Sequence, residues 1–452
     1  MASESAHQQV SSQDDPPQIA YIMKEYPRLS ETFIANEVAL LGKMGLRIRV
    51  YSVKKPSANS KQHATASATR SKVVYLPSVT SLSGSSLLGW LRVNLPRFVK
   101  SHLGLLKRRP GAYLSAWLEV ASMTLRYRAR FFEKPKKAFI KEFLQAGYIA
   151  RQILASEGIR HLHGHFCHGS TTITMFVSQL TKIPFSFTAH AKDIYLPKLN
   201  PGDLLKKKIR RAKFVVTCTG ANQAYLSQLC EGSRPVHTIY HGLDTRVFKA
   251  ATRDERHEEK PIILSVGRFV EKKGFIHLVK ACKILKDKGY DFQCRIVGEA
   301  DEQTEVIETL IRELELQGHL CIEGGVTQEA LRAIYNECSI FVLPCQIVNN
   351  GDRDGIPNVL VEAMAMEVPV VSTAISGIPE LVENGVDGLL TPQKDVPALA
   401  EALETYLKDP TLRVKLGRAG REKVLRLFDS EKTNIALKDL FMACVERRQT
   451  FR

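Results

Sequence analysis

The chain reads Asp354-Gly355-Ile356-Pro357-Asn358-Val359-Leu360-Val361-Glu362-Ala363-Met364-Ala365 across the start of a predicted helix, and this stretch decides the fold. Pro357 suits the first turn of a helix, where its missing N–H is no loss, and Gly355 lets a ligand approach the backbone. Asp354 then lies in the preceding loop, whereas Glu362 lies about two turns into the helix, on the face that Asn358 shares. Free N–H groups at a helix start suit a diphosphate, and the two carboxylates suit sugar and ribose hydroxyls. The stretch therefore predicts a nucleotide-sugar site, with donor contacts from Gly355, Ile356, Pro357, Asn358 and Glu362.

A basic loop follows the apolar strand predicted at residues 262–266. It reads Gly267-Arg268-Phe269-Val270-Glu271-Lys272-Lys273-Gly274. The Arg268 guanidinium can hold phosphate oxygens in a bidentate manner, and Lys273 supplies a point charge. Together these cations can neutralise a leaving diphosphate, which removes the need for a metal. The sequence predicts that Gly267, Arg268 and Lys273 bind the phosphates.

Apolar strands alternate with helices along most of the chain, which is typical of parallel sheets covered by helices on both faces. We therefore predict an α/β chain with two doubly wound, Rossmann-like domains facing each other across a cleft. Ligands of such sheets bind at the carboxyl ends of the strands. The clearer, second series predicts strands at Ile262–Val266, Gln293–Val297, Leu320–Glu323, Ile340–Leu343 and Pro369–Ser372.

The domain boundaries follow from this alternation and from composition. Residues 54–86, rich in Ser, Thr, Ala and Lys, predict a loop. Charged, poorly periodic residues predict a linker. The predicted parts are a disordered tail at 1–17, an acceptor-binding domain at 18–248, the linker at 249–260, a nucleotide-sugar-binding domain at 261–428 and a closing helix within 429–452.

These motifs together resemble those of retaining glycosyltransferases with the GT-B fold, in glycosyltransferase family 4 (glycosyl transferases group 1). The family pattern is Glu-x7-Glu, and this chain has the shorter Asp354 in the first position and Glu362 in the second. The resemblance implies that Asp354 contacts the donor sugar and Glu362 the ribose. It also implies that Gly325 and Val326 lie in the turn that contacts the base, and that the last helix crosses back to the first domain.

The same resemblance gives a catalytic place beside the donor sugar to His190, which follows the strand predicted at 185–188. The opening loop, Tyr26 to Phe33, resembles that of bacterial exopolysaccharide glycosyltransferases of the colanic-acid type. It places Ser30 and Glu31 on the acceptor side, although a helix cap also explains this pair. We place His165 on the acceptor side as well.

Two groups of residues suggest metal binding as an alternative role. The first is His161, His163, His165, His168 and Cys167, which include zinc-ligand types but lack the paired spacing of a closed site. The second is Asp352-Arg353-Asp354, which imitates the Asp-x-Asp triplet of GT-A glycosyltransferases. Because Arg268 and Lys273 already supply positive charge, we predict no metal and no cofactor.

The composition of the 452 residues, 44% hydrophobic and 25% charged, is that of an ordinary globular protein. No apolar run is long enough to span a bilayer, and the N-terminus is polar; with nine scattered cysteines this predicts a cytoplasmic protein. The net charge of +17 is concentrated between Arg92 and Lys141, where thirteen Lys or Arg face only Glu119 and Glu133. Apolar residues interleave with these cations. The segment therefore suits an anionic membrane surface better than a plain solvated face or nucleic acid.

We therefore predict a retaining, metal-independent glycosyltransferase of cell-surface polysaccharide synthesis, at the inner face of the plasma membrane. Its partners would be a nucleotide-sugar donor, a saccharide or lipid-linked saccharide acceptor, and an anionic membrane surface that the basic segment contacts. Two other classes remain open. A GT-B epimerase acting on a UDP-sugar shares the architecture, and a non-catalytic nucleotide- or nucleic-acid-binding protein would share the basic surface.

Overall fold

The computed structural model describes residues 18–28, 32–56, 71–82, 86–127, 136–156, 158–250 and 260–446. The predicted tail at 1–17, Ser30, Glu31 and most of the predicted linker lie outside these described residues.

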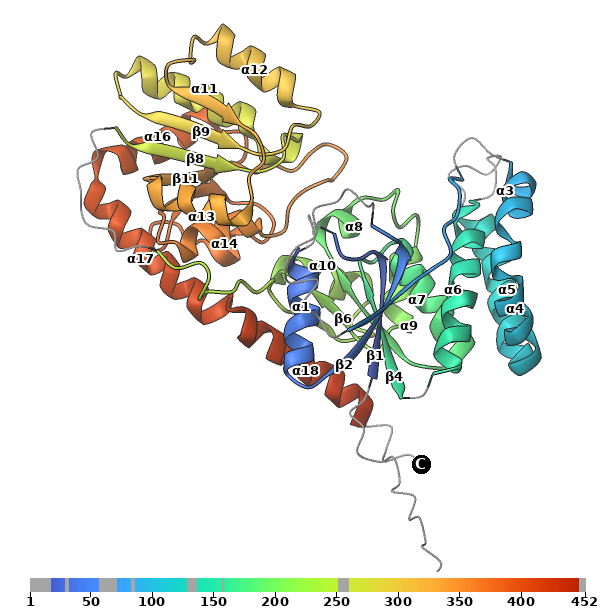
Figure 1. Ribbon diagram of the computed structural model, residues 1–452. Helices are drawn as coiled ribbons and strands as arrows, with labels where there is room; N and C mark the ends of the chain where they lie inside the picture. Colours follow the sequence, from blue (N-terminus) through green and yellow to red (C-terminus); the bar gives the residue numbers. More distant parts are fainter. Residues whose placement is uncertain are drawn as a thin grey trace, which may run out of the picture. The chain divides into compact units, whose positions relative to one another are not determined.

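The first sheet has seven strands in the order β3-β2-β1-β4-β5-β6-β7 (Figure 1). Strand β1 runs parallel to both of its neighbours, with Tyr21 opposite Val50 of β2 and His163 of β4. Strand β1 is buried over its first six residues, as expected where helices cover both faces of a parallel sheet. The strands are β1 (Gln18–Glu25), β2 (Arg47–Lys54), β3 (Lys72–Tyr75), β4 (Ile159–His165), β5 (Phe185–Ala189), β6 (Val215–Thr217) and β7 (Val236–Thr238).

The helices of this half include a group of long helices between β3 and β4. In that group α4 and α5 each pack on α6 (Figure 1). The helices are α1 (Thr32–Lys43), α3 (Leu87–Asn94), α4 (Pro96–Arg108), α5 (Pro110–Arg126), α6 (Ala138–Leu154), α7 (Gly169–Thr181), α8 (Ala191–Tyr195), α9 (Leu204–Arg211) and α10 (Gly220–Leu229).

The second sheet has six strands in the order β10-β9-β8-β11-β12-β13. Its apolar strands form one continuous core with the surrounding helices, and β11 and β12 are buried throughout. The strands are β8 (Ile262–Val266), β9 (Gln293–Val297), β10 (Leu320–Glu323), β11 (Ile340–Leu343), β12 (Val370–Thr373) and β13 (Leu389–Thr391). The helices are η2 (Glu271–Lys273), α11 (Phe275–Asp287), α12 (Thr304–Glu313), α13 (Gln328–Glu337), α14 (Asn358–Ala365), α15 (Ile378–Leu381), α16 (Val396–Lys408), α17 (Pro410–Leu427) and α18 (Ser430–Glu446).

Two doubly wound parallel sheets are therefore present, as predicted. The last helix, α18, places Phe441 against the first sheet, with its ring 6.0 Å from that of Tyr21 and 5.1 Å from that of His163. This contact is the predicted return of the closing helix to the first domain.

Two local predictions were wrong. Residues 72–75, expected within a loop, form the edge strand β3, because Val73 and Val74 pair with β2. Pro357, expected in the first helical turn, is the N-cap of α14: its ψ of 126° is extended, and the helix begins at Asn358.

The chain divides into two compact units. One comprises Met1–Gly164, Thr172–Phe185 and Leu440–Arg452, and the other His165–Thr171 and Ser186–Asp439. The first sheet contributes strands to both. All residues of the site described next belong to the second unit.

Candidate functional site

The basic loop after β8 is held in a fixed shape by its second glycine. Gly274 has a φ of 72°, and a Cβ there would lie 1.9 Å from the carbonyl oxygen of Pro344. Any other residue would therefore displace the backbone. Lys273 at the end of η2 folds back over the start of the loop, since a Cβ at Gly267 would lie 3.2 Å from Lys273 Cε. Gly267 and Lys273, two of the three predicted phosphate-binding residues, are thus neighbours in space.

Lys273 forms an ion pair with the first acid of the opening stretch. Its Nζ lies 2.7 Å from Asp354 Oδ2, and Lys272 Nζ lies 3.1 Å from Asp354 Oδ1 and 3.3 Å from Asp352 Oδ1. Burial alone would raise the pKa of Asp354, but Lys273 and Lys272 outweigh it and hold this pKa well below its usual range. Asp354 is therefore ionised at neutral pH and holds the lysine ammonium in place.

The structure shows Arg268 in a looser environment. Its Nη1 lies 3.2 Å from Asp301 Oδ2, and both side chains are substantially exposed. Such surface pairs contribute at most about 1 kcal/mol. The guanidinium can therefore leave Asp301 for a phosphate at little cost.

The second acid, Glu362, lies on α14 beside the buried Tyr335. The Tyr335 hydroxyl donates a hydrogen bond of 3.1 Å to Glu362 Oε2. Burial raises the pKa of Glu362 to about 7, and this hydrogen bond lowers it only in part. Glu362 is thus poised to change its ionisation near neutral pH.

This raised pKa predicts a change of stability with pH. Folded protein retains a proton on Glu362 that the unfolded chain has released, so the free energy of unfolding falls between the ordinary carboxyl pKa near 4.3 and the folded value of about 7. Glu362→Gln cannot titrate. Relative to the wild type, its free energy of unfolding should rise by up to about 4 kcal/mol across this window. Urea unfolding at both ends of the window measures the difference.

Glu329→Gln provides the matched control, because it makes the same substitution at an exposed position of the same unit. A Glu362→Gln difference that stays constant with pH would contradict the assignment.

His190 lies where β5 ends and α8 begins. Its backbone N–H donates to Asp193 Oδ1 at 3.0 Å, and the other carboxylate oxygen of Asp193 accepts from the backbone N–H of Cys167. The buried Lys208 donates to the carbonyl oxygen of Cys167 at 2.8 Å and to Asn200 Oδ1 at 2.8 Å. The buried Asp193 thus fixes the backbone at His190 and at Cys167, and the buried Lys208 fixes Cys167 further.

Aromatic rings surround the His190 imidazole. Ring centroids lie 4.6 Å away in Phe166, 5.2 Å in His241 and 6.1 Å in His165. Burial, and then His241, lower the pKa of His190 well below its ordinary value, while Asp193 opposes them. The imidazole is therefore neutral at neutral pH. His165, predicted on the acceptor side, is buried and stacks beside it.

A small pocket borders the start of α14, within the stretch that begins at Asp354. Of the predicted donor-binding residues, Ile356 and Asn358 line it. Gly355 does not line the pocket and packs beside Thr219. The full lining is Cys218, His241, Ile356, Asn358, Val361 and Phe428.

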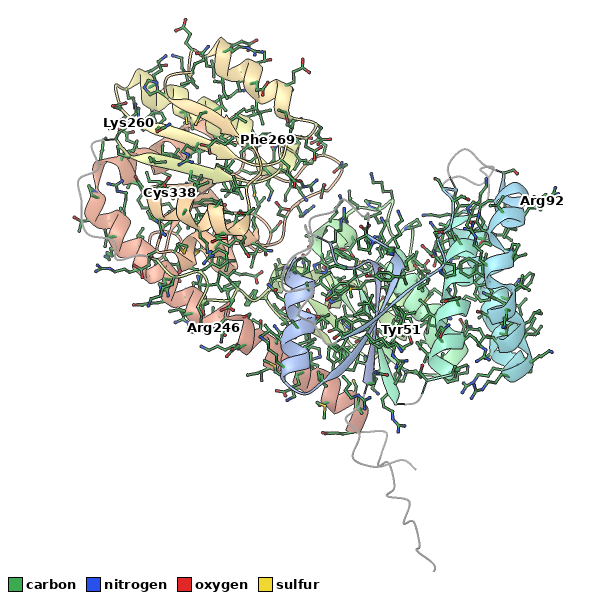
Figure 2. The ribbon with its side chains drawn as sticks, in the orientation of Figure 1. Tyr51, Arg92, Arg246, Lys260, Phe269 and Cys338 are labelled. Carbon is green, nitrogen blue, oxygen red and sulfur yellow. The ribbon has the colours of Figure 1, made fainter. Side chains whose placement is uncertain are left out.

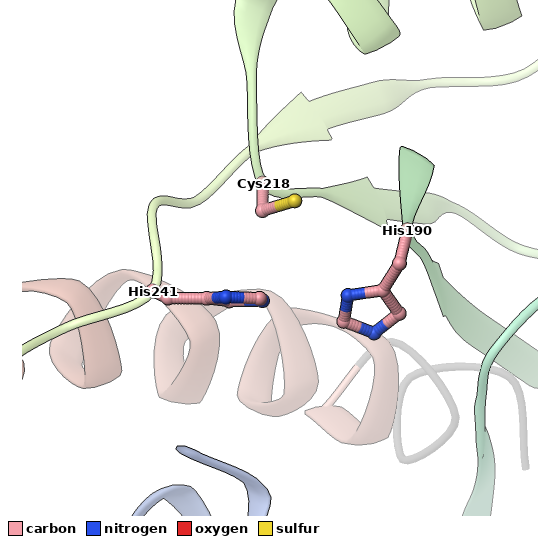
Figure 3. Close-up of side chains that lie close together, drawn as sticks. All are labelled: His190, Cys218 and His241. Carbon is pink, nitrogen blue, oxygen red and sulfur yellow. The ribbon is translucent and has the colours of Figure 1, made fainter. Parts of the chain in front are cut away.

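Three of these neighbouring side chains have metal-ligand chemistry. His190, Cys218 and His241 each direct one ligand atom into a common space, and these atoms lie within 4.8 Å of one another (Figure 3). Among the described residues this is the group whose spacing would hold a metal ion. Of the histidines of β4 that suggested a metal in the sequence, His161 and His163 pack on the ring of Phe441, whereas His165 stacks beside His190.

The remaining predicted residues are placed separately. Gly325 and Val326 lie in the loop after β10, where Val326 is exposed and Gly325 packs beside Glu299. Sequence reasoning missed the pairing of Lys272, the hydrogen bond from Tyr335 and the part played by Cys218. A lysine doublet and an isolated cysteine carry no signal of such contacts.

Residues 248–423 match the family model described as glycosyl transferases group 1. Over 418 residues the chain is 28% identical to the amylovoran biosynthesis glycosyltransferase AmsK of Erwinia amylovora, which covers 90% of this chain and 94% of that protein. It is 27% identical over 443 residues to Escherichia coli WcaL, assigned to colanic acid biosynthesis, with 94% and 99% covered.

Solved structures show the same architecture. Sucrose-phosphate synthase from Thermosynechococcus elongatus superposes with a TM-score of 0.66 at 19% identity, covering 96% of this chain and 99% of that one. Anabaena HepE in complex with UDP and glucose superposes with a TM-score of 0.65 at 15% identity, covering 94% and 100%. At such low identity these likenesses concern the fold alone.

Proposed function

This chain is a group 1 glycosyltransferase with the GT-B fold, and on that premise we propose that it transfers a sugar from a nucleotide-sugar to a saccharide acceptor with retention of configuration. The observation that carries the proposal is the ion pair between Lys273 and Asp354. It joins the predicted phosphate loop to the predicted sugar-binding acid. The relatives in amylovoran and colanic acid synthesis support an acceptor in exopolysaccharide assembly.

In the proposed reaction the bond between the anomeric carbon and the diphosphate oxygen breaks as negative charge develops on the diphosphate. Lys273 and Arg268 stabilise that charge. The acceptor hydroxyl attacks the anomeric carbon from the same face, and its proton passes to the departing phosphate oxygen. Asp354 holds sugar hydroxyls and Glu362 the ribose, while neutral His190 offers a hydrogen bond beside the sugar. No side chain acts as general base in this scheme.

We propose that this chemistry needs no metal and no cofactor, because lysine and arginine supply the positive charge. The ion pairs of one cluster support this proposal, because Lys272 and Lys273 neutralise the charges of Asp352 and Asp354. A carboxylate pair already occupied by ammonium groups is poorly disposed to hold a magnesium ion.

The stereochemical test follows the anomeric signal of the product by NMR, using a donor of known configuration. Product with the donor's configuration, formed equally with EDTA present, supports the proposal. Product with inverted configuration contradicts retention. Epimerised donor formed without any acceptor would instead favour a GT-B epimerase.

The acceptor is proposed to be lipid-linked, at the inner face of the plasma membrane. Helices α3, α4 and α5 display apolar side chains to solvent, and Leu103 and Trp117 are each 53% exposed. Exposed cations accompany them, among them Arg92 on α3 (Figure 2) and Lys107 on α4. A mixed basic and apolar surface suits anionic lipid, each cation near the surface contributing about 1 kcal/mol. No helix among the described residues has the length and apolarity to cross a bilayer.

This surface predicts binding to vesicles. Wild-type protein should sediment with vesicles containing anionic lipid and remain in solution with zwitterionic ones. The variant Leu103→Ser/Leu106→Ser/Trp117→Ser should bind at least about 10-fold more weakly, because burying three large apolar groups contributes several kcal/mol. Val306→Ser/Val386→Ser, which removes exposed apolar residues of the other half, should bind as the wild type does. Wild-type protein that does not sediment with anionic vesicles would contradict the proposal of a membrane-bound acceptor.

A further inference from the structure

Three loops at the carboxyl ends of neighbouring strands bring two imidazoles and a thiol together. His190 follows β5, Cys218 follows β6 and His241 comes three residues after β7 ends (Figure 3). His190 and Cys218 are buried, and His241 is partly buried. Parallel strands that end at one edge of a sheet make such a convergence rigid.

We propose that His190, Cys218 and His241 form a binding site for a soft divalent cation of the zinc type. Two imidazole nitrogens and one thiolate are the ligands that zinc prefers, and three protein ligands leave the fourth tetrahedral position for water. Zinc bonds of about 2.0–2.3 Å place tetrahedral ligand atoms roughly 3.3–3.8 Å apart. The three atoms here lie within 4.8 Å, so small side-chain rotations close the site.

The surroundings fit a bound cation. The pocket that Cys218 and His241 line gives a route for the ion and room for its water ligand. Asp193 fixes the His190 backbone and brings a buried negative charge close to the imidazole. Carboxylates near a ligating histidine orient it and favour the cation. Binding of the cation replaces the proton of the Cys218 thiol, and this proton is released to water.

The consequence for activity rests on the proposed function. A cation bound to His190 withdraws this imidazole from the donor sugar, and its water ligand occupies the pocket lined by Asn358. Zinc should therefore inhibit transfer, even though transfer needs no metal. Free zinc would thus inhibit the enzyme, and a chelator that removes the zinc should restore its activity.

Cobalt titration of the metal-free full-length protein tests the site directly. The wild type should bind one equivalent and develop the thiolate-to-cobalt charge-transfer absorption, and zinc should displace it. Cys218→Ser should lose that absorption and bind at least about 10-fold more weakly. Cys230→Ser is the matched control, because Cys230 is a buried free cysteine of the same unit that lies outside the cluster. His241→Ala, a second variant, should weaken binding as well.

A wild type without the charge-transfer absorption, or a Cys218→Ser variant that keeps it, would overturn the site. Inhibition is measured separately, as the fraction of each variant's own metal-free activity that zinc removes. Wild-type activity should be lost near one equivalent of zinc. Cys218→Ser should need a zinc concentration at least about 10-fold higher for the same inhibition. A protein inactive with every donor would overturn the proposed function, whereas the cobalt absorption would still decide the metal site.

Discussion

Replacing Lys273 by alanine should lower kcat/KM for the donor by about 10³-fold, the largest loss expected for any single substitution here. The ammonium group is held 2.7 Å from Asp354 beside the glycine loop, already positioned before the diphosphate arrives. Its charge matters most when the bond to the sugar breaks. Initial rates over a range of donor concentrations, with nucleoside diphosphate release as the readout, measure the loss.

Two further variants separate catalysis from folding. Lys273→Ala leaves Asp354 paired with Lys272 alone, so the free energy of unfolding should fall by less than the roughly 3–5 kcal/mol typical of a broken buried pair. Adding Asp354→Asn should restore stability without restoring activity. Lys280→Ala, an exposed lysine of α11, should match the wild type in both respects. A Lys273→Ala enzyme within about 3-fold of the wild type would contradict the role given to this lysine.

His190→Ala should lower kcat by about 10²-fold, because a preorganised hydrogen-bonding group beside the sugar is lost. Burial and His241 hold the pKa of His190 well below its ordinary value, so the wild-type imidazole stays neutral as pH falls through the usual histidine range. The His190 imidazole should therefore add no inflection to the wild-type kcat near the unperturbed histidine pKa of about 6.5. Rate measurements at saturating donor across this range give the profile.

His319→Ala, which removes a histidine that packs on Phe292 away from the site, is the matched control and should keep the wild-type kcat. His190→Gln, which can still donate a hydrogen bond, should recover part of the loss. An inflection in kcat that vanishes in His190→Ala would show that the imidazole titrates during turnover, against this account.

Five of the six strands of the second sheet were predicted from the sequence; β12 begins one residue later than predicted, and β13 was not predicted. Strands β8, β9, β10 and β11 have the predicted bounds, because each is a short run rich in apolar residues between turn residues. Strand β3 could not be found in this way. Its four residues sit at a sheet edge among Ser, Thr and Lys, where a short run carries little periodic signal.

The residues of the candidate site could be predicted from the sequence, but the contacts between them could not. The glycine-bounded loop and the acid pair each have a recognisable spacing, so Lys273, Asp354 and Glu362 could be named. Spacing could not show that Lys273 bonds to Asp354, because β9, β10 and β11 intervene between them. The cluster of His190, Cys218 and His241 is likewise assembled by three separate strands, and only tertiary structure reveals it.

The central claim is that the loop from Gly267 to Gly274 and the stretch from Asp354 to Glu362 form one metal-independent donor site. The most direct test is the melting temperature of the wild type and of Lys273→Ala with UDP-, GDP-, ADP- and TDP-sugars, with and without EDTA. A ligand that binds only the native state raises the melting temperature. The account predicts that one nucleotide family stabilises the wild type equally in EDTA and that Lys273→Ala loses this effect. Stabilisation that EDTA abolishes, or that Lys273→Ala retains in full, would contradict it.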